Sequence, residues 1–176
     1  CGVCNRSTPG TSNGACGLSG DPALHPGVDS ERVGNEEEIV NLVATIEKDI
    51  GPIEVAIYNA SGHVRAMVTE LSAEDFRAGW ESTCFGAFLM GREVAKRMLP
   101  REMGTILFTG ASAGVKGFPQ SAPFAMGKFG LRGLAQSMAR ELHPKNIHVV
   151  HVVVDGGIRS ERRGRDGRDG RDGRDT

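Results

Sequence analysis

Apolar residues change spacing several times along this chain, and the order of those changes restricts the folds open to it. Helical spacing and short β-rich runs alternate over residues 35–50, 53–58, 72–99, 105–109, 121–142 and 147–154. Strands joined by helices of this length pair in parallel through right-handed crossovers. The pattern predicts an α/β fold, a doubly wound parallel sheet with helices on both faces.

Capping residues mark where two of the helices begin. Asn35 precedes Glu38 by three residues, and Ser72 precedes Asp75 by three, so each first residue can accept a hydrogen bond from the first turn. The expected inward faces of the three helices are Ile39, Leu42, Val43, Ile46 and Ile50; Phe76, Trp80, Ala87, Val94 and Met98; and Leu131, Leu134, Met138 and Leu142.

The composition divides the chain into three zones. Residues 1–34 are rich in Gly, Ser, Pro and Asn and predict an irregular leader, whereas residues 35–160 predict one folded domain. Residues 161–176 repeat Arg, Asp and Gly and predict a low-complexity tail. Arginine-glycine tracts suggest RNA binding, but an adjacent Asp lowers the positive potential of each Arg, which favours a solvated tail.

Charge and hydropathy exclude two classes of partner. A formal net charge of -1 gives no basic field for nucleic acid, and no apolar stretch is long enough to span a membrane. We therefore expect a cytoplasmic protein. The CGVC sequence at 1–4, with Cys16 and His25, has the spacing of a zinc half-site but matches no zinc module, so we expect no metal.

The segment TGASAGVKG at 109–117 allows two interpretations: a phosphate-binding loop, or the rim of an active site. A dinucleotide loop follows the first strand, and an acidic residue ends the next strand about 20 residues later. Here the next strand begins at Ile147 and ends near Asp155, about twice as far away. Lys116 also stands where a phosphate-binding loop would need another glycine. The segment is therefore interpreted as the rim of an active site.

Five motifs in order resemble the short-chain dehydrogenase/reductase family of the classical type. They are YNAS at 58–61, WESTCFG at 80–86, TGASAGVKG at 109–117, FAMGK at 124–128 and DGGIRS at 155–160. FAMGK stands where the family has Y-x-x-x-K, which places the chain in a subgroup with F-x-x-x-K. The resemblance implies a partial Rossmann-like domain, and an enzyme that interconverts a carbonyl and an alcohol with NAD or NADP.

The resemblance also assigns catalytic positions, most of which carry other residues here. Phe124 occupies the tyrosine position and has no proton to give, Ala111 the serine position, and Thr83 the asparagine position. Lys128 is unchanged, and Ser112 lies one residue from the serine position. Ser112 either substitutes for that serine or bonds its own turn. A hydrolytic pair of Ser112 and Lys128 lacks an accompanying oxyanion pattern.

Cofactor contacts are implied at Asn59, Ala60, Lys128, Gly156 and Ser160. The family's first strand, glycine loop and second strand have no counterpart before residue 35. PGTSNGACG at 9–17 echoes a glycine loop but follows no apolar strand. We therefore expect the N-terminal cofactor-loop unit to be missing and the edge of the strand at 53–58 to be open.

Two functions follow as hypotheses. The first is an NAD(P)-dependent oxidoreductase acting on a small carbonyl or alcohol substrate, impaired because the tyrosine acid is absent. The alternative is a non-catalytic scaffold or truncated product acting through oligomerisation, since the helices expected at 72–99 and 121–142 form the usual dimer faces of the family. Either hypothesis implies a homo-oligomer.

Overall fold

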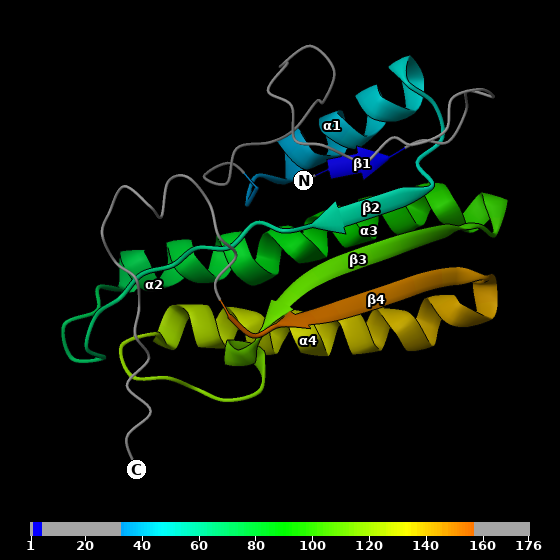
Figure 1. The fold of residues 1–176 in the computed structure, drawn as a ribbon. Helices are drawn as coiled ribbons and strands as arrows, with labels where there is room; N and C mark the ends of the chain where they lie inside the picture. The colour runs from blue at the N-terminus through cyan, green and yellow to red at the C-terminus, as the bar shows by residue number, and fades with distance from the viewer. Residues whose placement is uncertain (1, 5–32, 157–176) are drawn as a thin grey trace.

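The computed structural model describes residues 2–4 and 33–156. Within them a four-stranded sheet has the order β1-β2-β3-β4 and lies against a layer of helices (Figure 1). The strands are β1 (Gly2–Cys4), β2 (Val55–Tyr58), β3 (Gly104–Ala111) and β4 (Ile147–Val154). The α-helices are α1 (Glu36–Asp49), α2 (Ala73–Trp80), α3 (Gly86–Met98) and α4 (Ala122–Leu142). No helix in this described part is both long and apolar enough to cross a bilayer.

The predicted parallel pairing is confirmed for β2, β3 and β4, in which Ala56 stands opposite Ile106 and Ile106 opposite Val149. The pairing of β1 differs from expectation. Val3 stands opposite Ala56 in an antiparallel ladder, so residues 2–4 form a strand although residues 1–34 were predicted to be irregular. The expected open edge of β2 is therefore wrong, because β1 covers it from Val55 to Ile57.

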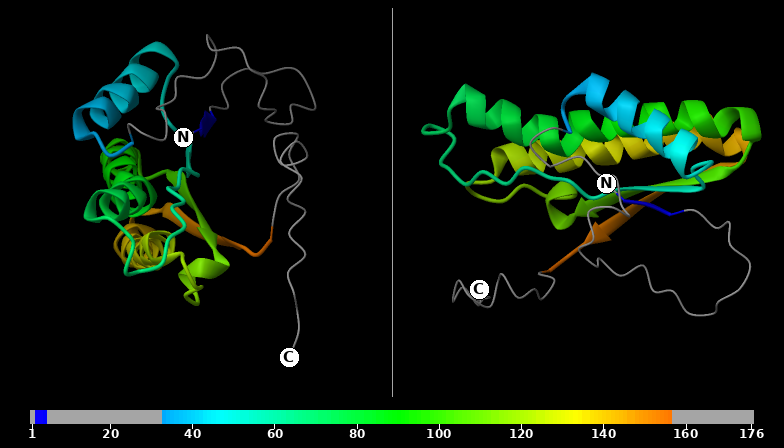
Figure 2. Two further views of the ribbon diagram at one scale, coloured as in Figure 1. Left: turned by 90° about the vertical axis from the view of Figure 1, so that its left-hand side faces the viewer. Right: turned by 90° about the horizontal axis from the view of Figure 1, so that it is seen from above.

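The prediction of helices on both faces is wrong for the described residues. All four α-helices lie on one face of the sheet (Figure 2). The strand order explains this for α2, α3 and α4, because successive right-handed crossovers that advance in one direction, from β2 to β4, bring their helices to the same side. A helix reaches the other face only where the strand order reverses. Ile57, Leu107 and Val150 point to that other face and are only half-buried.

The hydrophobic core lies between the helices and the face of the sheet that they cover. Alternate strand residues point into it, among them Ala56, Ile106 and Phe108, which are almost fully buried. The predicted inward faces of α1 and α4 are confirmed in large part: the buried members are Ile39, Val43, Ile46, Leu131, Met138 and Leu142. Ile50 differs, since it follows the last turn of α1 and is 51% exposed.

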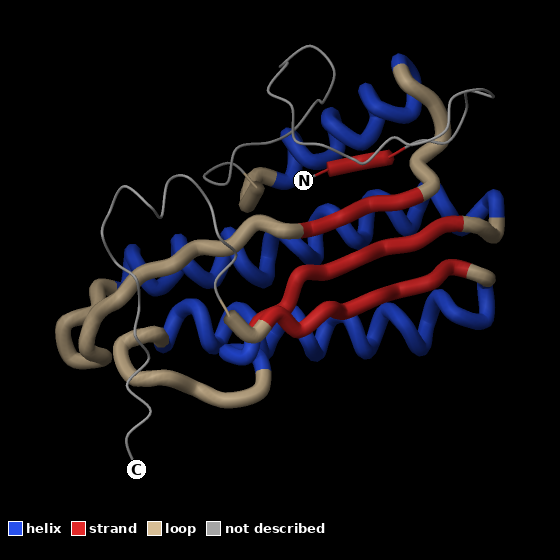
Figure 3. Tube along the Cα trace, viewed as in Figure 1, coloured by secondary structure: helices blue, strands red, loops and turns tan. Residues whose placement is uncertain are grey.

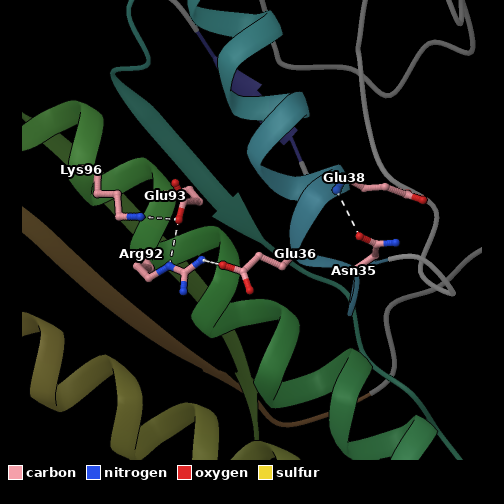
Figure 4. Close-up of polar contacts among 6 residues, drawn as sticks. All are labelled: Asn35, Glu36, Glu38, Arg92, Glu93 and Lys96. Carbon is pink, nitrogen blue, oxygen red and sulfur yellow. Dashed lines mark hydrogen bonds and ion pairs between the residues drawn. The ribbon is translucent and has the colours of Figure 1, made fainter.

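Polar contacts fasten the start of α1 to α3 (Figure 4). Asn35 caps α1 as predicted, accepting a hydrogen bond from the Glu38 backbone N–H at 3.3 Å. Arg92 of α3 forms ion pairs with Glu36 and, at 2.8 Å, with Glu93. Burial alone would raise the pKa of the Glu93 carboxyl, but the hydrogen bonds from Lys96 and Arg92 outweigh it and lower the pKa.

The helix predicted over 72–99 is interrupted by a π-helical segment, η1 (Glu81–Phe85). The cause is Tyr58, whose hydroxyl donates to the Ser82 carbonyl oxygen at 2.5 Å. The Gly86 N–H bonds the Glu81 carbonyl instead of the Ser82 carbonyl, which makes the turn one residue wider. The inward face is therefore as predicted in α3 but not in α2, where Phe76 and Trp80 are half-exposed.

Close packing joins η1 to α4. A Cβ on Gly127 would lie 2.6 Å from Cβ of Thr83, a distance that side chains do not tolerate. Gly127 therefore lets α4 approach η1 closely, and this contact sets the position of the first turns of α4 relative to the sheet.

Candidate functional site

Two loops meet at the carboxyl end of the parallel strands, one at 59–72 after β2 and one at 115–121 between β3 and α4 (tan in Figure 3). The Ala66 N–H donates to the Gln120 carbonyl at 3.3 Å and joins them. Ligands of open α/β sheets bind in the crevice outside this edge. The helix α4 also begins here, and its first turns carry two of the residues singled out in the sequence.

Lys128 and Phe124 are neighbours in the structure. The Lys128 Nζ lies 5.6 Å from the centre of the Phe124 ring and donates a hydrogen bond to the Thr109 carbonyl near the end of β3 at 2.7 Å. Lys128 is 3% exposed, and burial lowers the pKa of its ammonium to about 8. The Thr109 carbonyl is its one hydrogen-bond acceptor among the described residues, so two of its N–H donors remain available.

His63 lies on the loop at 59–72 and contacts the phenyl ring of Phe124. Its imidazole is 5.0 Å from the Phe124 ring, centre to centre, and the two planes cross at 76°. Sequence reasoning found no ligand spacing for His63 and left it out. Spacing gives no signal for it, because this contact joins the loop at 59–72 to the first turn of α4, and the whole of α2, α3 and β3 lies between them in the sequence.

Three other residues singled out from the sequence lie nearby. Ser112 follows β3, its carbonyl accepts from its own turn, and its hydroxyl has no hydrogen-bond partner in the described part of the chain. Ala111 ends β3. Thr83 is fully buried, and its Oγ1 accepts from the Gly62 N–H at 3.0 Å. Lys128 donates to a backbone carbonyl and not to Ser112, so the hydrolytic pair is not formed.

The chain's single tyrosine does not replace the missing phenol. Tyr58 is fully buried in the core, and its hydroxyl donates to the Ser82 carbonyl. Burial, the larger effect, and the neighbouring Cys84 both raise the pKa of this hydroxyl above its usual value. Tyr58 therefore supplies no proton at the carboxyl edge of the sheet.

His151 is a second histidine that sequence reasoning left out. Its Nε2 is buried without a hydrogen-bond partner, the only such side-chain atom in the residues that the structure describes. Burial lowers the pKa of the imidazole, and the positive charges of Arg132 and Lys128 lower it further. Gly110 leaves room for this ring, because a Cβ there would lie 2.3 Å from Nε2.

The positions assigned to a nicotinamide cofactor are partly described. Asn59 is exposed and Ala60 half-exposed directly after β2, and Gly156 follows β4 with a φ of +133°. Lys128 at the same edge has two N–H donors without an acceptor among the described residues, and a hydroxyl of the ribose next to a nicotinamide ring would be a suitable acceptor. Ser160 lies outside the described residues.

Other interpretations also concern undescribed parts of the chain. The zinc half-site candidates Cys1, Cys16 and His25, the glycine-rich 9–17 and the tail at 161–176 lie outside them. Within the described residues, no three His, Cys, Asp or Glu side chains gather as they would to hold a metal.

Known proteins resemble this chain in sequence and in fold. The short-chain dehydrogenase family model matches residues 25–169. The 3-oxoacyl-(acyl-carrier-protein) reductase MabA of Mycobacterium tuberculosis is 29% identical over 143 residues, which are 81% of this chain and 57% of MabA. The chain therefore spans little more than half the length of this relative.

Two solved structures of related proteins are also similar to this chain in sequence and fold. A short-chain dehydrogenase from Rhodopseudomonas palustris is 42% identical with a TM-score of 0.69, over 74% of this chain and 59% of that one. An NAD+-bound xylitol dehydrogenase is 27% identical with a TM-score of 0.71, over 76% of this chain and 52% of that one. With its parallel sheet and the matched family model, the chain belongs to the short-chain dehydrogenase/reductase family.

Proposed function

We propose that this chain is an NAD(P)-dependent oxidoreductase that interconverts a small carbonyl compound and an alcohol. The observation that carries the proposal is the position of Lys128, a buried ammonium with free donors at the carboxyl edge of the sheet. A structural lysine is usually exposed, so its burial here beside the site needs a reason. Holding the ribose hydroxyls of a nicotinamide cofactor supplies one.

The roles of the remaining residues follow from their positions. Asn59, Ala60 and Gly156 border the cofactor at the ends of β2 and β4; the role of Ser160 rests on the sequence resemblance alone. The Ser112 hydroxyl, which has no hydrogen-bond partner among the described residues, orients the carbonyl oxygen. Phe124 has no proton to donate, so the reaction is slower than with a tyrosine, by about a hundredfold or more.

A binding experiment tests the proposal directly. Trp80, the chain's one tryptophan, stacks on Phe85 at the end of α2, and its fluorescence should change when NADH or NADPH is added. Lys128→Met should weaken that binding at least tenfold, whereas Lys116→Met, on an exposed lysine, should not. Binding of neither nucleotide by the full chain, or equal binding by Lys128→Met, contradicts the proposal.

A second candidate is a non-catalytic scaffold that acts through self-association. Large apolar side chains are exposed on the outer sides of α3 and α4: Phe88 is 39% exposed, Met126 54% and Phe129 46%. Exposed apolar clusters of this kind mark interfaces. A homo-oligomer in the cytoplasm fits both candidates. Sedimentation of the full chain and of Phe129→Ser tests it: a monomeric variant that still binds nucleotide supports an interface separate from the cofactor site.

A further inference from the structure

We propose that His63 is the proton donor of the reaction, in place of the tyrosine hydroxyl that Phe124 lacks. The inference rests on the proposed oxidoreductase function and adds a catalytic residue to it. It starts from one juxtaposition: an imidazole from the loop at 59–72 contacts the ring that stands where the acid is missing, with Lys128 on the same ring.

The geometry places an acid where one is needed. The centres of the His63 and Phe124 rings are 5.0 Å apart in an edge-to-face contact, so the imidazole lies directly against the side chain that occupies the tyrosine position. His63 is exposed, which leaves it accessible from solvent. Histidine is the side chain most often used as general acid near neutral pH.

The loop holds His63 in this place from both sides. On one side the Gly62 N–H donates to Oγ1 of the buried Thr83 at 3.0 Å. A Cβ on Gly62 would lie 2.7 Å from Cα of Gly79, so the backbone of the loop sits directly on α2. On the other side the Ala66 N–H bonds the Gln120 carbonyl. Thr83 is thus a positioning residue for His63.

The other candidate acids near the edge are engaged elsewhere or are weak. The Tyr58 hydroxyl is buried and bonded to the Ser82 carbonyl. Lys128 is 3% exposed, its ammonium is bonded to the Thr109 carbonyl, and its remaining donors are assigned to the cofactor ribose. The Ser112 hydroxyl is a far weaker acid than an imidazolium. Among these described residues, His63 differs because its side chain is exposed and its imidazole contacts the Phe124 ring.

The proposed step balances in atoms and charge. A reduced nicotinamide cofactor, when bound, would supply the hydride and be oxidised. As a C–H bond forms at the carbonyl carbon, the π electron pair moves to the oxygen. The imidazolium of His63 gives its N–H proton to that oxygen, the N–H bond breaks, and the products are the alcohol and a neutral imidazole.

The test compares the full chain with His63→Ala and with His148→Ala, a matched histidine at the far end of β4. With NADPH and a panel of small ketones and aldehydes, His63→Ala should lower kcat by about a hundredfold to ten-thousandfold, and free imidazole should restore part of the rate. Nucleotide affinity, followed by Trp80 fluorescence, should stay within threefold. His148→Ala should change neither. The imidazole signal of His63 in NMR spectra is identified as the one that disappears in His63→Ala. This signal should shift when NADPH is added to the full chain.

The outcomes separate this inference from the function on which it rests. If the His63→Ala variant reduces carbonyls as fast as the unsubstituted chain, the role of His63 is overturned and the oxidoreductase function is left intact. A loss of kcat without imidazole rescue, or with a matching loss of nucleotide affinity, assigns His63 a structural role and overturns the inference. A full chain that neither binds nucleotide nor reduces any carbonyl overturns both proposals.

Discussion

Lys128 is bonded to the main chain of the strand beneath it: its Nζ donates to the Thr109 carbonyl at 2.7 Å. This bond joins the first turns of α4 to the end of β3, and it removes an ammonium group almost completely from water. A buried charge with one acceptor destabilises a fold. The buried ammonium of Lys128 is therefore better explained by a function at this edge of the sheet than by a contribution to stability.

Lys128→Met should accordingly stabilise the protein at pH 7. The pKa of the ammonium falls from 10.5 to about 8 on folding, so the folded state loses its proton first as pH rises. Stability should rise between pH 8 and 10.5 in the wild type, by about 2 to 3 kcal/mol, and this rise should vanish in Lys128→Met. Urea unfolding at several pH values across that range measures the free energy of unfolding, with Lys116→Met as control. If the dependence of this free energy on pH is the same in Lys128→Met as in the wild type, burial of the ammonium does not destabilise the fold.

His151 should make the protein sensitive to acid. Its pKa is lowered from 6.5 on folding, because the side chain is partly buried and the positive charges of Arg132 and Lys128 disfavour the imidazolium. The unfolded chain therefore binds a proton that the folded chain resists, so stability is fully present above pH 6.5 and declines below it. Thermal unfolding at pH 7 and pH 5 should show a smaller loss for His151→Gln than for the wild type. His148→Gln, which changes an exposed histidine, should behave as wild type.

Two glycines of α4 should respond to alanine with opposite signs. At Gly127 a Cβ meets the side chain of Thr83 at 2.6 Å, so Gly127→Ala should lower the free energy of unfolding by about 1 to 3 kcal/mol. At Gly133 nothing lies within 4 Å, so Gly133→Ala should raise it by about 0.5 to 1 kcal/mol through helix propensity. Equal effects in urea unfolding would refute the packing of α4 on η1.

Restoring the phenol at Phe124 should not restore a fast enzyme. Ala111 still lacks a hydroxyl, and the Oγ1 of Thr83 is occupied by the Gly62 N–H. We expect Phe124→Tyr to change kcat/KM for carbonyl reduction by less than about tenfold. Phe124→Tyr combined with Ala111→Ser should gain more than either change alone. A gain of a hundredfold from the single substitution contradicts this account.

Local signals in the sequence determined the elements of this fold. The cap at Asn35, the β-rich run that became β4 and the helix ending at Leu142 were all predicted within a residue or two. Such features depend on neighbours in the chain, where hydrogen bonds and apolar spacing act over one or two turns. The parallel pairing of β2, β3 and β4 followed because the length of the connecting helices leaves few other topologies.

The sequence also placed Lys128 and Phe124 next to each other on one helix face, because their spacing of four residues is itself local. Contacts between distant segments were decided only by the tertiary structure. The antiparallel β1, the π turn caused by Tyr58 and the ring contact between His63 and Phe124 each join parts of the chain that no periodicity relates. Burial and crowding fix such contacts, and these quantities exist only once helices and strands have packed.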